Sequence, residues 1–394
     1  MTKKLVVIGR GTAGVQSAAH FSRYMENCDI EWHYDPNIKT QPVGEGSTLA
    51  FPTNLHSWIG FSHLDIDKLD GSFKTGIAKE GWGKEGKAFF HDFLPPEVAY
   101  HFNAIKFQEY MFNKLAGRVK FVEHNTNSKD IDADFIMDCS GKPSSYDEFN
   151  LSEYINVNAV HVTQCFWDYP RFQYSLNIAR PYGWVFGIPL HNRCSIGYMY
   201  NNKINTLEEV KEDVKYMFEK YNLTPSDTTN SFSFANYTRK KNYDGRIAYN
   251  GNASFFLEPL EATSVGVMDT IQRSAFDLWS GSMSEQQAED KYHLELKQIE
   301  TFITMHYLDG SPFKTKFWEF AQERAERCFA NISKDTAFVN LYKQVRKTKA
   351  INDCYLAQGK YGQWWSGSFL QNIEGIGLYD KIDSYINLGE TNAS

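Results

Sequence analysis

A glycine-rich loop directly after the first apolar run constrains the fold of this chain more than any other feature. The run Lys4–Ile8 reads KLVVI, and residues 9–14 continue as GRGTAG, which fits the spacing GxGxxG. A short β-branched run that ends at a glycine is typical of a buried parallel strand. Residues 12–26 then carry apolar side chains at helical spacing, and residues 29–34 are again rich in β formers. The order strand, glycine loop, helix and strand predicts a βαβ unit.

The glycine loop predicts a binding site for a dinucleotide. Gly9 would permit the tight turn, Gly11 would let the backbone approach a pyrophosphate, and Gly14 would let the helix pack on the strand. Thr12 and Ala13 open the helix, whose free N–H groups and positive dipole end favour phosphate. A plain tight turn is the alternative, because short glycine motifs also occur by chance.

The acidic residue that would bind the ribose is left open between two candidates. In this kind of unit it lies about 20 residues after the glycine loop, near the end of the second strand. Asp35 follows that strand and Glu31 lies within it, while Tyr34 is closer to the usual position. Asp35 is the preferred candidate.

Length and charge exclude several classes of function. With 394 residues the chain is long enough for two or three domains or for one large α/β enzyme. Hydrophobic residues make up 42% and charged residues 23%, so a packed core is expected rather than disorder. The net charge of −7 disfavours nucleic acid as a partner, because domains that neutralise phosphate backbones are usually basic.

Three further absences narrow the class. No stretch of about 18 apolar residues is present, so neither a transmembrane helix nor a membrane partner is predicted. The 6 cysteines are scattered and form no CxxC pair, which indicates a reduced, cytoplasmic protein. The histidines show no HExxH spacing, so no metal site is predicted.

Later segments predict two further layers. Strand-like runs lie at 119–123 and 134–138, and the block 158–200 alternates β formers in the manner of an antiparallel sheet. Helices are expected at 205–222, 284–307 and 314–329. The second of these helices opens with a capping box that pairs Ser284 with Gln287. Strands early and helices late predict an α/β domain with an inserted antiparallel sheet and a helical C-terminal layer.

Eight segments resemble, in the same order and at similar spacing, the flavin-dependent tryptophan-halogenase family. They are GRGTAG at 9–14, PVGEGST at 42–48, GSFKTGIAKEGW at 71–82, AYHFNAIKF at 99–107, IMDCSGKPS at 136–144, GWVFGIP at 183–189, GNASFFLEPLEATSV at 251–265 and HYLDGSPFKTKFWEF at 306–320. The resemblance covers most of residues 4–330. Arg10 and Asn252 stand where the family usually has Gly and Asp, and Phe186 replaces the second tryptophan of its signature WxWxIP.

The resemblance implies a fold and a division of the chain. The expected fold is the FAD/NAD(P)-binding, flavin monooxygenase-like α/β fold. Residues 1–330 would form the FAD-binding and catalytic body, with the inserted sheet at about 155–200. Residues 331–394 would form a helical and aromatic segment that covers the substrate.

The resemblance also implies an activity. FADH2 from a separate flavin reductase, O2 and a halide (chloride, bromide or iodide) would give hypohalous acid, which halogenates an electron-rich aromatic substrate such as an indole or a phenol. The absence of a second glycine loop for a nicotinamide is consistent with diffusible FADH2. A flavin-dependent aromatic hydroxylase (monooxygenase) and a non-catalytic flavin-binding protein are the alternatives. A marine viral (cyanophage) source, with the host cytoplasm as location, is a further expectation; the oligomeric state is left open.

Two residues carry the chemistry that the resemblance implies. Lys74 would hydrogen-bond hypohalous acid or form a transient haloamine, and Glu261 would polarise hypohalous acid or take the ring proton. A lysine that snorkels at the surface and a glutamate in a water-facing turn are the ordinary alternatives. Lys79 falls outside the motif position, so its replacement is expected to be nearly neutral.

The same resemblance implies the surroundings of this pair. The FAD-binding residues outside the glycine loop and Asp35 would be Gly46, Ser47, Thr48, Gly251 and Asn252. Thr263 and Ser264 would present backbone N–H groups to a halide, although a simple turn without an anion is the alternative.

A wall between flavin and organic substrate is implied for the GWVFGIP segment. Its residues Trp184, Phe186 and Pro189 would form that wall, and a buried strand that ends at proline is the alternative. His91 is expected to line the substrate pocket, whereas His101 fits a core position beside aromatic residues. The aromatic substrate and the halide preference are left open.

Overall fold

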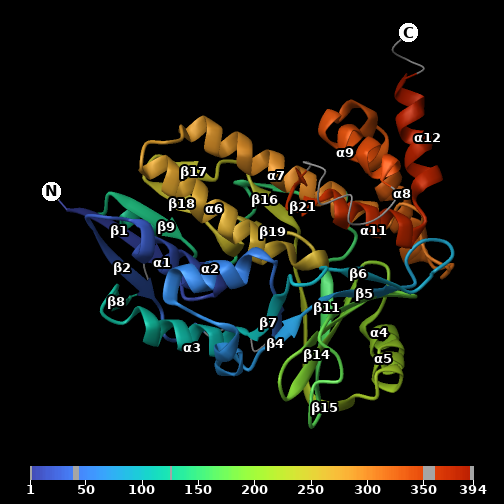
Figure 1. Ribbon diagram of the computed structural model, residues 1–394, viewed down its shortest axis with the longest axis horizontal. Coiled ribbons are helices and arrows are strands. Elements are labelled where there is room, and N and C mark those ends of the chain that lie inside the picture. Colours follow the sequence, from blue (N-terminus) through green and yellow to red (C-terminus); the bar gives the residue numbers. More distant parts are fainter. Residues whose placement is uncertain (1, 39–43, 125–126, 349–359, 391–394) are drawn as a thin grey trace. The chain divides into compact units, whose positions relative to one another are not determined.

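A computed structural model of the chain describes residues 2–38, 44–124, 127–348 and 360–390 (Figure 1). Pro42 and Val43 of the PVGEGST segment therefore lie outside the described residues. The chain divides into two compact units. The first unit comprises Met1–Lys74, Val98–Leu151 and Asn236–His293, and the second comprises Thr75–Glu97, Ser152–Ala235 and Leu294–Ser394. None of the described helices is long and apolar enough to cross a membrane.

A six-stranded sheet of order β17-β18-β9-β1-β2-β8 forms the centre of the first unit. Its strands are β1 (Lys3–Ile8), β2 (Cys28–Tyr34), β8 (Lys120–Glu123), β9 (Phe135–Asp138), β17 (Tyr243–Asp244) and β18 (Ile247–Tyr249). All pairs are parallel except β17 with β18 at the edge. The predicted βαβ unit is confirmed, because helix α1 (Thr12–Tyr24) joins β1 to β2.

The burial of β1 follows from its sequence. Leu5 and Val7 are fully buried, as expected for a parallel strand that is covered on both faces. Val6 and Ile8 alternate with them and pack in a separate apolar cluster with Ile131 from the connection before β9. Helix α1 packs against α2 (Ala50–Ile59), α3 (Ala104–Leu115) and α6 (Thr263–Trp279) (Figure 1).

Two antiparallel three-stranded sheets complete the first unit. One has the order β3-β7-β4, with β3 (Gly44–Gly46), β7 (Ala99–Asn103) and β4 (Ser72–Lys74). The other has the order β10-β16-β19, with β10 (Phe149–Leu151), β16 (Tyr237–Arg239) and β19 (Phe255–Phe256). In the first of these sheets His101 on the central strand pairs with Gly46 on one side and Ser72 on the other.

A seven-stranded sheet of order β15-β11-β14-β13-β12-β5-β6 dominates the second unit. Its strands are β5 (Gly76–Glu80), β6 (Phe89–Asp92), β11 (Ala159–Phe166), β12 (Ser175–Arg180), β13 (Gly183–Pro189), β14 (Arg193–Tyr200) and β15 (Thr224–Ser233). The antiparallel block predicted at 158–200 is confirmed. The sheet is larger than predicted, because β5 pairs in parallel with β12 and β6 pairs antiparallel with β5.

Helices cover the second unit. They are α4 (Leu207–Asp213), α5 (Lys215–Lys220), α8 (Lys316–Phe329), α9 (Thr336–Lys347), α11 (Ser366–Ile376) and α12 (Tyr379–Glu390), while α7 (Glu285–Met305) spans the boundary between the units in the sequence. A two-stranded sheet joins β20 (Lys360–Tyr361) to β21 (Trp364–Trp365).

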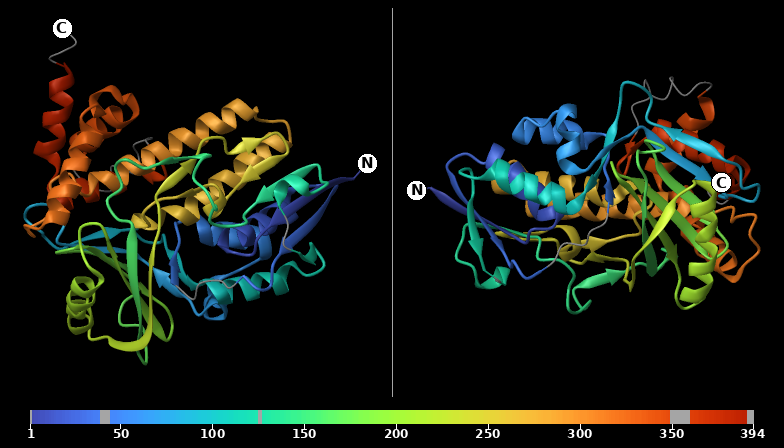
Figure 2. Two further views of the ribbon diagram at one scale, coloured as in Figure 1. Left: turned by 180° about the vertical axis from the view of Figure 1, so that it is seen from behind. Right: turned by 90° about the horizontal axis from the view of Figure 1, so that it is seen from below.

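Two helix predictions have different outcomes. The capping box is confirmed, because Ser284 N–H donates to Gln287 Oε1 at 2.9 Å and Gln287 N–H donates to Ser284 Oγ at 3.2 Å. The single helix expected at 205–222 is instead two helices that meet at Val214, where the chain tightens to an i→i+3 hydrogen bond with Met217. Both residues pack into an apolar cluster with side chains of the seven-stranded sheet. The two helices lie beside that sheet (Figure 2).

Candidate active site

The three glycines of the loop between β1 and α1 have three different surroundings. Gly9 has a φ of +90°, and a Cβ there would lie 2.2 Å from the carbonyl oxygen of Cys139. A Cβ on Gly14 would lie 2.0 Å from the carbonyl oxygen of Gly9, so the loop and the helix need both glycines to fold. A Cβ on Gly11 would meet nothing within 4 Å among the described residues. The space at Gly11 is open, which fits a close approach by a ligand.

A second segment approaches the glycine loop. Gly251 has a φ of +58°, and a Cβ there would lie 2.7 Å from the Cβ of Ala13. Asn252, which is exposed, accepts a hydrogen bond at its backbone carbonyl from the Tyr237 hydroxyl at 2.7 Å. The structure thus brings the predicted residues at 251–252 to the start of α1. These surroundings fit a dinucleotide such as FAD, which needs glycines where its pyrophosphate meets the backbone.

The two acidic candidates for the ribose have different environments. Asp35 follows the end of β2, and its Oδ1 accepts a hydrogen bond from Asn37 N–H at 2.8 Å. Glu31 lies within β2 and forms ion pairs with Lys4 and Lys120. Although burial raises the pKa of Glu31, hydrogen bonds led by that from Lys120 lower it to about 2. Because Glu31 is held in ion pairs with these lysines, Asp35 stays the candidate for binding the ribose at the carboxyl end of the strand.

The segment at 44–48 connects the glycine loop to Lys74. The Thr12 hydroxyl at the start of α1 donates to Glu45 Oε1 at 2.6 Å, and burial raises the pKa of Glu45. Gly46 ends β3, and Thr48 precedes α2. Ser47 is fully buried and fixes the segment to β7, because its N–H donates to the Tyr100 carbonyl at 2.8 Å and its Oγ accepts from Tyr100 N–H at 2.9 Å.

Lys74 ends β4 inside the first unit. Its side chain is 1% exposed, and its Nζ donates a hydrogen bond to the carbonyl oxygen of Ser47 at 3.1 Å. His101, on the same face of the β4–β7 ladder, is fully buried, and its Nδ1 lies 3.1 Å from Ser72 Oγ. Burial, aided by the positive charge of Lys74, holds the pKa of His101 well below 6.5. A neutral histidine therefore accompanies the buried amine.

Glu261 lies in a strained turn before α6. It is 5% exposed and has a φ of +65°, and Ala262 beside it has a φ of +59°. Consecutive non-glycine residues in the left-handed region are costly and are concentrated at functional sites. Glu258 in the same turn is fully buried, so neither glutamate faces water.

The two residues predicted for the halide open α6. Thr263 is its first residue, is 1% exposed, and has a hydroxyl oxygen without a hydrogen-bond partner among the described residues. Ser264 follows and is half-buried. The N-terminus of this helix thus offers N–H groups, a positive dipole end and a buried hydroxyl, which is a suitable environment for an anion.

The residues predicted for the wall all lie in the second unit. Trp184 is fully buried on β13, and its ring centroid lies 6.3 Å from that of Trp82 and 6.3 Å from that of Phe186. Phe186 faces Gly197 across the β13–β14 ladder, where a Cβ would lie 2.0 Å from the phenylalanine ring. Pro189 ends β13. Gly197 therefore makes the room that the Phe186 ring occupies.

His91 on β6 is tied to α11 within the second unit. It is 3% exposed, its Nε2 lies 3.1 Å from Ser368 Oγ, and its ring packs edge-on against Phe93. Lys79 on the neighbouring strand β5 is only 1% exposed. The sequence predicts that its replacement is nearly neutral, but a side chain this deeply buried has a structural role. The sequence contained no signal for its partners, because they follow it by more than 200 residues.

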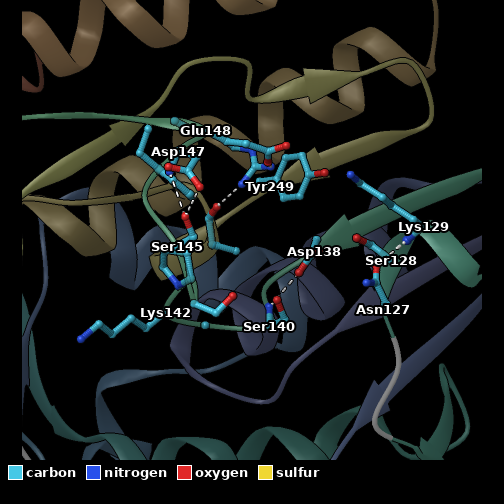
Figure 3. Close-up of a pocket in the computed structure, with 16 residues that line it drawn as sticks. Asn127, Ser128, Lys129, Asp138, Ser140, Lys142, Ser145, Asp147, Glu148 and Tyr249 are labelled. Atoms are coloured by element: carbon cyan, nitrogen blue, oxygen red, sulfur yellow. Dashed lines mark hydrogen bonds and ion pairs between the residues drawn. The ribbon is translucent and has the colours of Figure 1, made fainter.

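A cavity of about 670 Å³ in the first unit was not predicted from the sequence (Figure 3). It adjoins the glycine loop through the segment IMDCSGKPS, since Gly9 packs against Cys139. Its labelled lining residues are Asn127, Ser128, Lys129, Asp138, Ser140, Lys142, Ser145, Asp147, Glu148 and Tyr249. None of the sequence-predicted FAD residues lines it, and its side chains carry both signs of charge.

Comparisons with known proteins identify the family of this chain. The family model described as tryptophan halogenase matches residues 4–118 and 97–381. The tryptophan 7-halogenase RebH of Lentzea aerocolonigenes is 20% identical over 358 residues, which cover 66% of this chain and 67% of that protein.

Solved structures show the same fold. Xcc4156, a flavin-dependent halogenase from Xanthomonas campestris, has a TM-score of 0.79 at 17% identity and covers 96% of this chain and 89% of its own. BrvH, a flavin-dependent halogenase from Brevundimonas sp. BAL3, has a TM-score of 0.75 at 18% identity and covers 100% of this chain and 95% of its own. The predicted α/β fold is confirmed.

The family match, together with the shared fold, places the chain in the class of flavin-dependent halogenases. The chain belongs to the tryptophan halogenase family, whose model matches most of its length. Members of this family are flavin-dependent halogenases that use FADH2, O2 and halide, so the predicted enzyme class and cofactors are confirmed.

Proposed function

We propose that this enzyme halogenates an electron-rich aromatic substrate, such as an indole or a phenol, with Lys74 and Glu261 as its catalytic residues. The observation that carries the proposal is the burial of both side chains in the same unit, at 1% and 5% exposure. Burial of ionisable groups is costly and is retained at sites that use them. A lysine that snorkels at the surface and a glutamate in a water-facing turn would both be exposed.

The residues of the first unit fit FAD. Gly9, Gly11 and Gly14 would hold its pyrophosphate at the start of α1, and Asp35 would hold the ribose. The flavin end would lie along residues 46–48 and 251–252, since Gly251 approaches Ala13. When bound, FADH2 together with O2 supplies the oxidation of halide to hypohalous acid.

Lys74 would orient hypohalous acid for attack by the aromatic ring. Its hydrogen bond to Ser47 fixes the direction of the amine, and neutral His101 does not compete with it as a cation. The carbon–halogen bond forms as the halogen–oxygen bond breaks, and the oxygen leaves as water with a proton from Lys74. In this role Lys74 stabilises the leaving oxygen rather than the halogen.

Glu261 would accept the proton that the ring carbon loses after halogenation, which restores aromaticity. The left-handed backbone at Glu261 and Ala262 supports this role, because a position held under strain fixes the carboxylate in one direction. Thr263, two residues later at the start of α6, would hold the halide with its buried hydroxyl. One short segment would thus serve both anion binding and proton removal.

The second unit would supply the organic substrate site. The fully buried ring of Trp184 and the half-buried ring of Phe186 would separate flavin from substrate, with Pro189 at the end of the same strand. His91 would contact the aromatic substrate, with Ser368 holding its imidazole. Since residues 331–394 contribute α11, they would cover this site.

The test mixes the purified protein with FADH2, bromide and a panel of indoles and phenols, and detects bromine isotope doublets by mass spectrometry. Hydroxylated products without bromine would indicate an aromatic hydroxylase, and FAD binding without any product would indicate a flavin-binding protein. Gly11→Ala should weaken FAD binding by about tenfold or more without unfolding the protein, because the described residues leave space for the methyl group. Gly14→Ala should instead impair folding, because its methyl would meet the Gly9 carbonyl.

A separate flavin reductase is proposed as the source of FADH2, because the GxGxxG loop at 9–14 leads from a strand into a helix. The segment GWGKEG at 81–86 has the same spacing but joins strand β5 to strand β6 and is followed by no helix. The cytoplasm, of a host cell if the source is viral, is the proposed location. The cysteines Cys28, Cys139, Cys165, Cys194 and Cys328 are all free, which agrees with a reducing compartment.

A further inference from the structure

Arg10 lies between the first two glycines of the loop. Its guanidinium carbon is 5.7 Å from the centroid of the Tyr34 ring. Arg10 follows β1 and Tyr34 ends β2, and these two strands are parallel neighbours. The Arg10 side chain therefore lies along the edge where the carboxyl ends of β1 and β2 meet. In sheets of this kind, ligands bind at that edge.

The backbone of Arg10 is anchored, whereas part of its guanidinium is not. Gln108 of α3 donates a hydrogen bond to the Arg10 carbonyl oxygen, which holds the loop in place. The Nε atom of Arg10 is buried and has no hydrogen-bond partner among the described residues. Guanidinium nitrogens only donate, and a buried donor without an acceptor is costly. A ligand that brings acceptors to this edge would remove that cost.

We propose that Arg10 binds the adenosine diphosphate half of FAD. The proposal rests on the proposed FAD site and adds to it a residue that stands where the resembled family usually has glycine. In a βαβ unit the pyrophosphate lies at the start of the helix and the ribose at the end of the second strand. Arg10 lies between these positions, beside Tyr34. Its planar donors match phosphate oxygens, so it would strengthen binding by charge-assisted hydrogen bonds.

The test measures binding of FAD, ADP and FMN to the purified wild-type protein and to Arg10→Gly and Arg10→Ala, by calorimetry and flavin fluorescence. We expect the affinities for FAD and ADP to fall by about fivefold to twentyfold, since one charge-assisted donor group is lost. FMN lacks the adenosine monophosphate part, and its affinity should change by less than about twofold. Arg10→Lys should restore only part of the loss, because an ammonium lacks the planar set of donors.

Arg23→Ala is the matched control. Its guanidinium lies 5.9 Å from the Tyr24 ring centroid, in the last turn of α1 rather than in the loop. This variant should bind all three ligands as the wild type does. Arg10 variants with wild-type affinity for FAD and ADP would overturn the proposal. An equal loss of FAD, ADP and FMN binding with a lowered Tm would also overturn it, because that result indicates a disrupted loop. Failure of the wild type to bind FAD would instead overturn the proposed function.

Discussion

Lys79 Nζ lies 2.6 Å from Nε2 of His306, and both residues belong to the second unit. The Nδ1 of His306 lies 2.9 Å from the Phe302 carbonyl oxygen, so Nδ1 carries the hydrogen and Nε2 accepts from the lysine. Asn372 Oδ1 accepts a second hydrogen bond from Lys79 at 2.6 Å. The buried amine thereby links β5 to the end of α7 and to α11.

We therefore expect Lys79→Ala to lower the free energy of unfolding by about 3 kcal/mol, because two buried acceptors lose their donor and a cavity forms. Lys79→Met keeps the length of the side chain but removes the donors, so it should lower the free energy of unfolding by less. Urea denaturation measures the effect, and turnover per folded molecule should stay near that of the wild type. Wild-type stability in Lys79→Ala would contradict the structural role. Lys79→Ala, which the sequence predicts to be nearly neutral, is therefore unsuitable as a control for the Lys74 variants.

Lys74 variants should separate the formation of hypohalous acid from carbon halogenation. Lys74→Ala should retain FAD binding and still release hypohalous acid to a diketone trap, while aromatic product is lost. Lys74→Arg should also fail, because a guanidinium differs in shape and is too weak an acid to give a proton to the leaving oxygen. Glu261→Gln should reduce product less completely, since it keeps size and a polar oxygen. Mass spectrometry of product and trap in the same samples measures both steps.

Lys106→Ala is the control for this series, because the Lys106 side chain is 52% exposed on α3 and forms an exposed ion pair with Glu109 at 3.0 Å. It should halogenate like the wild type. If Lys74→Ala halogenates at the wild-type rate, the lysine assignment is wrong. If product then also forms when substrate and enzyme are separated by a dialysis membrane, free hypohalous acid does the chemistry in solution.

Thr263→Val tests the halide site at the start of α6. The substitution removes a buried hydroxyl that has no partner among the described residues, so the apo protein should be as stable as the wild type or more stable. If the hydroxyl binds halide, the KM for bromide should rise by about tenfold, with a smaller change in kcat.

Thr270→Val, on the same helix, is the matched control. Its hydroxyl donates to the Gly266 carbonyl at 3.4 Å within α6 and should not affect halide. An unchanged KM for bromide in Thr263→Val would refute the halide assignment.

His20 makes the stability of the first unit sensitive to acid. It is 3% exposed on α1, among the rings of Tyr24, Trp58 and Phe276, and neither ring nitrogen has a hydrogen-bond partner among the described residues. Burial, with the charge of Arg273, lowers its pKa to about 3. Below the unfolded pKa of 6.5, the unfolded chain binds a proton that the folded protein does not.

The contribution of His20 to the free energy of unfolding should therefore be largest above pH 6.5 and should fall as the pH decreases toward 3. At pH 5 the loss from His20 is at most about 2 kcal/mol. His20→Leu should remove this part of the pH dependence, as measured by urea denaturation at pH 7 and pH 5. His124→Leu, at an exposed position, should keep the wild-type slope. Equal slopes in all three proteins would contradict the assignment.

The local parts of the fold could be predicted from the sequence because their signals are local. The run KLVVI and the glycines after it specify β1, the turn and α1, and the pairing of Ser284 with Gln287 specifies where α7 begins. The parallel pairing of β5 with β12 could not be predicted, since nearly a hundred residues separate the strands and no periodic pattern records the pairing.

The candidate site divides in the same way. The resemblance to the halogenase family singled out Lys74, Glu261 and Thr263, whereas the GxGxxG spacing after a strand singled out the glycine loop. Spacing does not encode burial, so the buried state of Lys79 and the backbone strain at Glu261 became visible only in the folded chain.

By itself the sequence determined the βαβ start, the class of cofactor and the residue types available for catalysis, since each follows from short-range pattern and side-chain chemistry. Only the tertiary structure decided which polar groups meet. It placed Ser47 against the Lys74 amine and His306 against Lys79, and it opened the space at Gly11 while closing that at Gly9 and Gly14. The physical reason is that such contacts join strands and helices distant in the chain, and their geometry is set by packing of the whole unit.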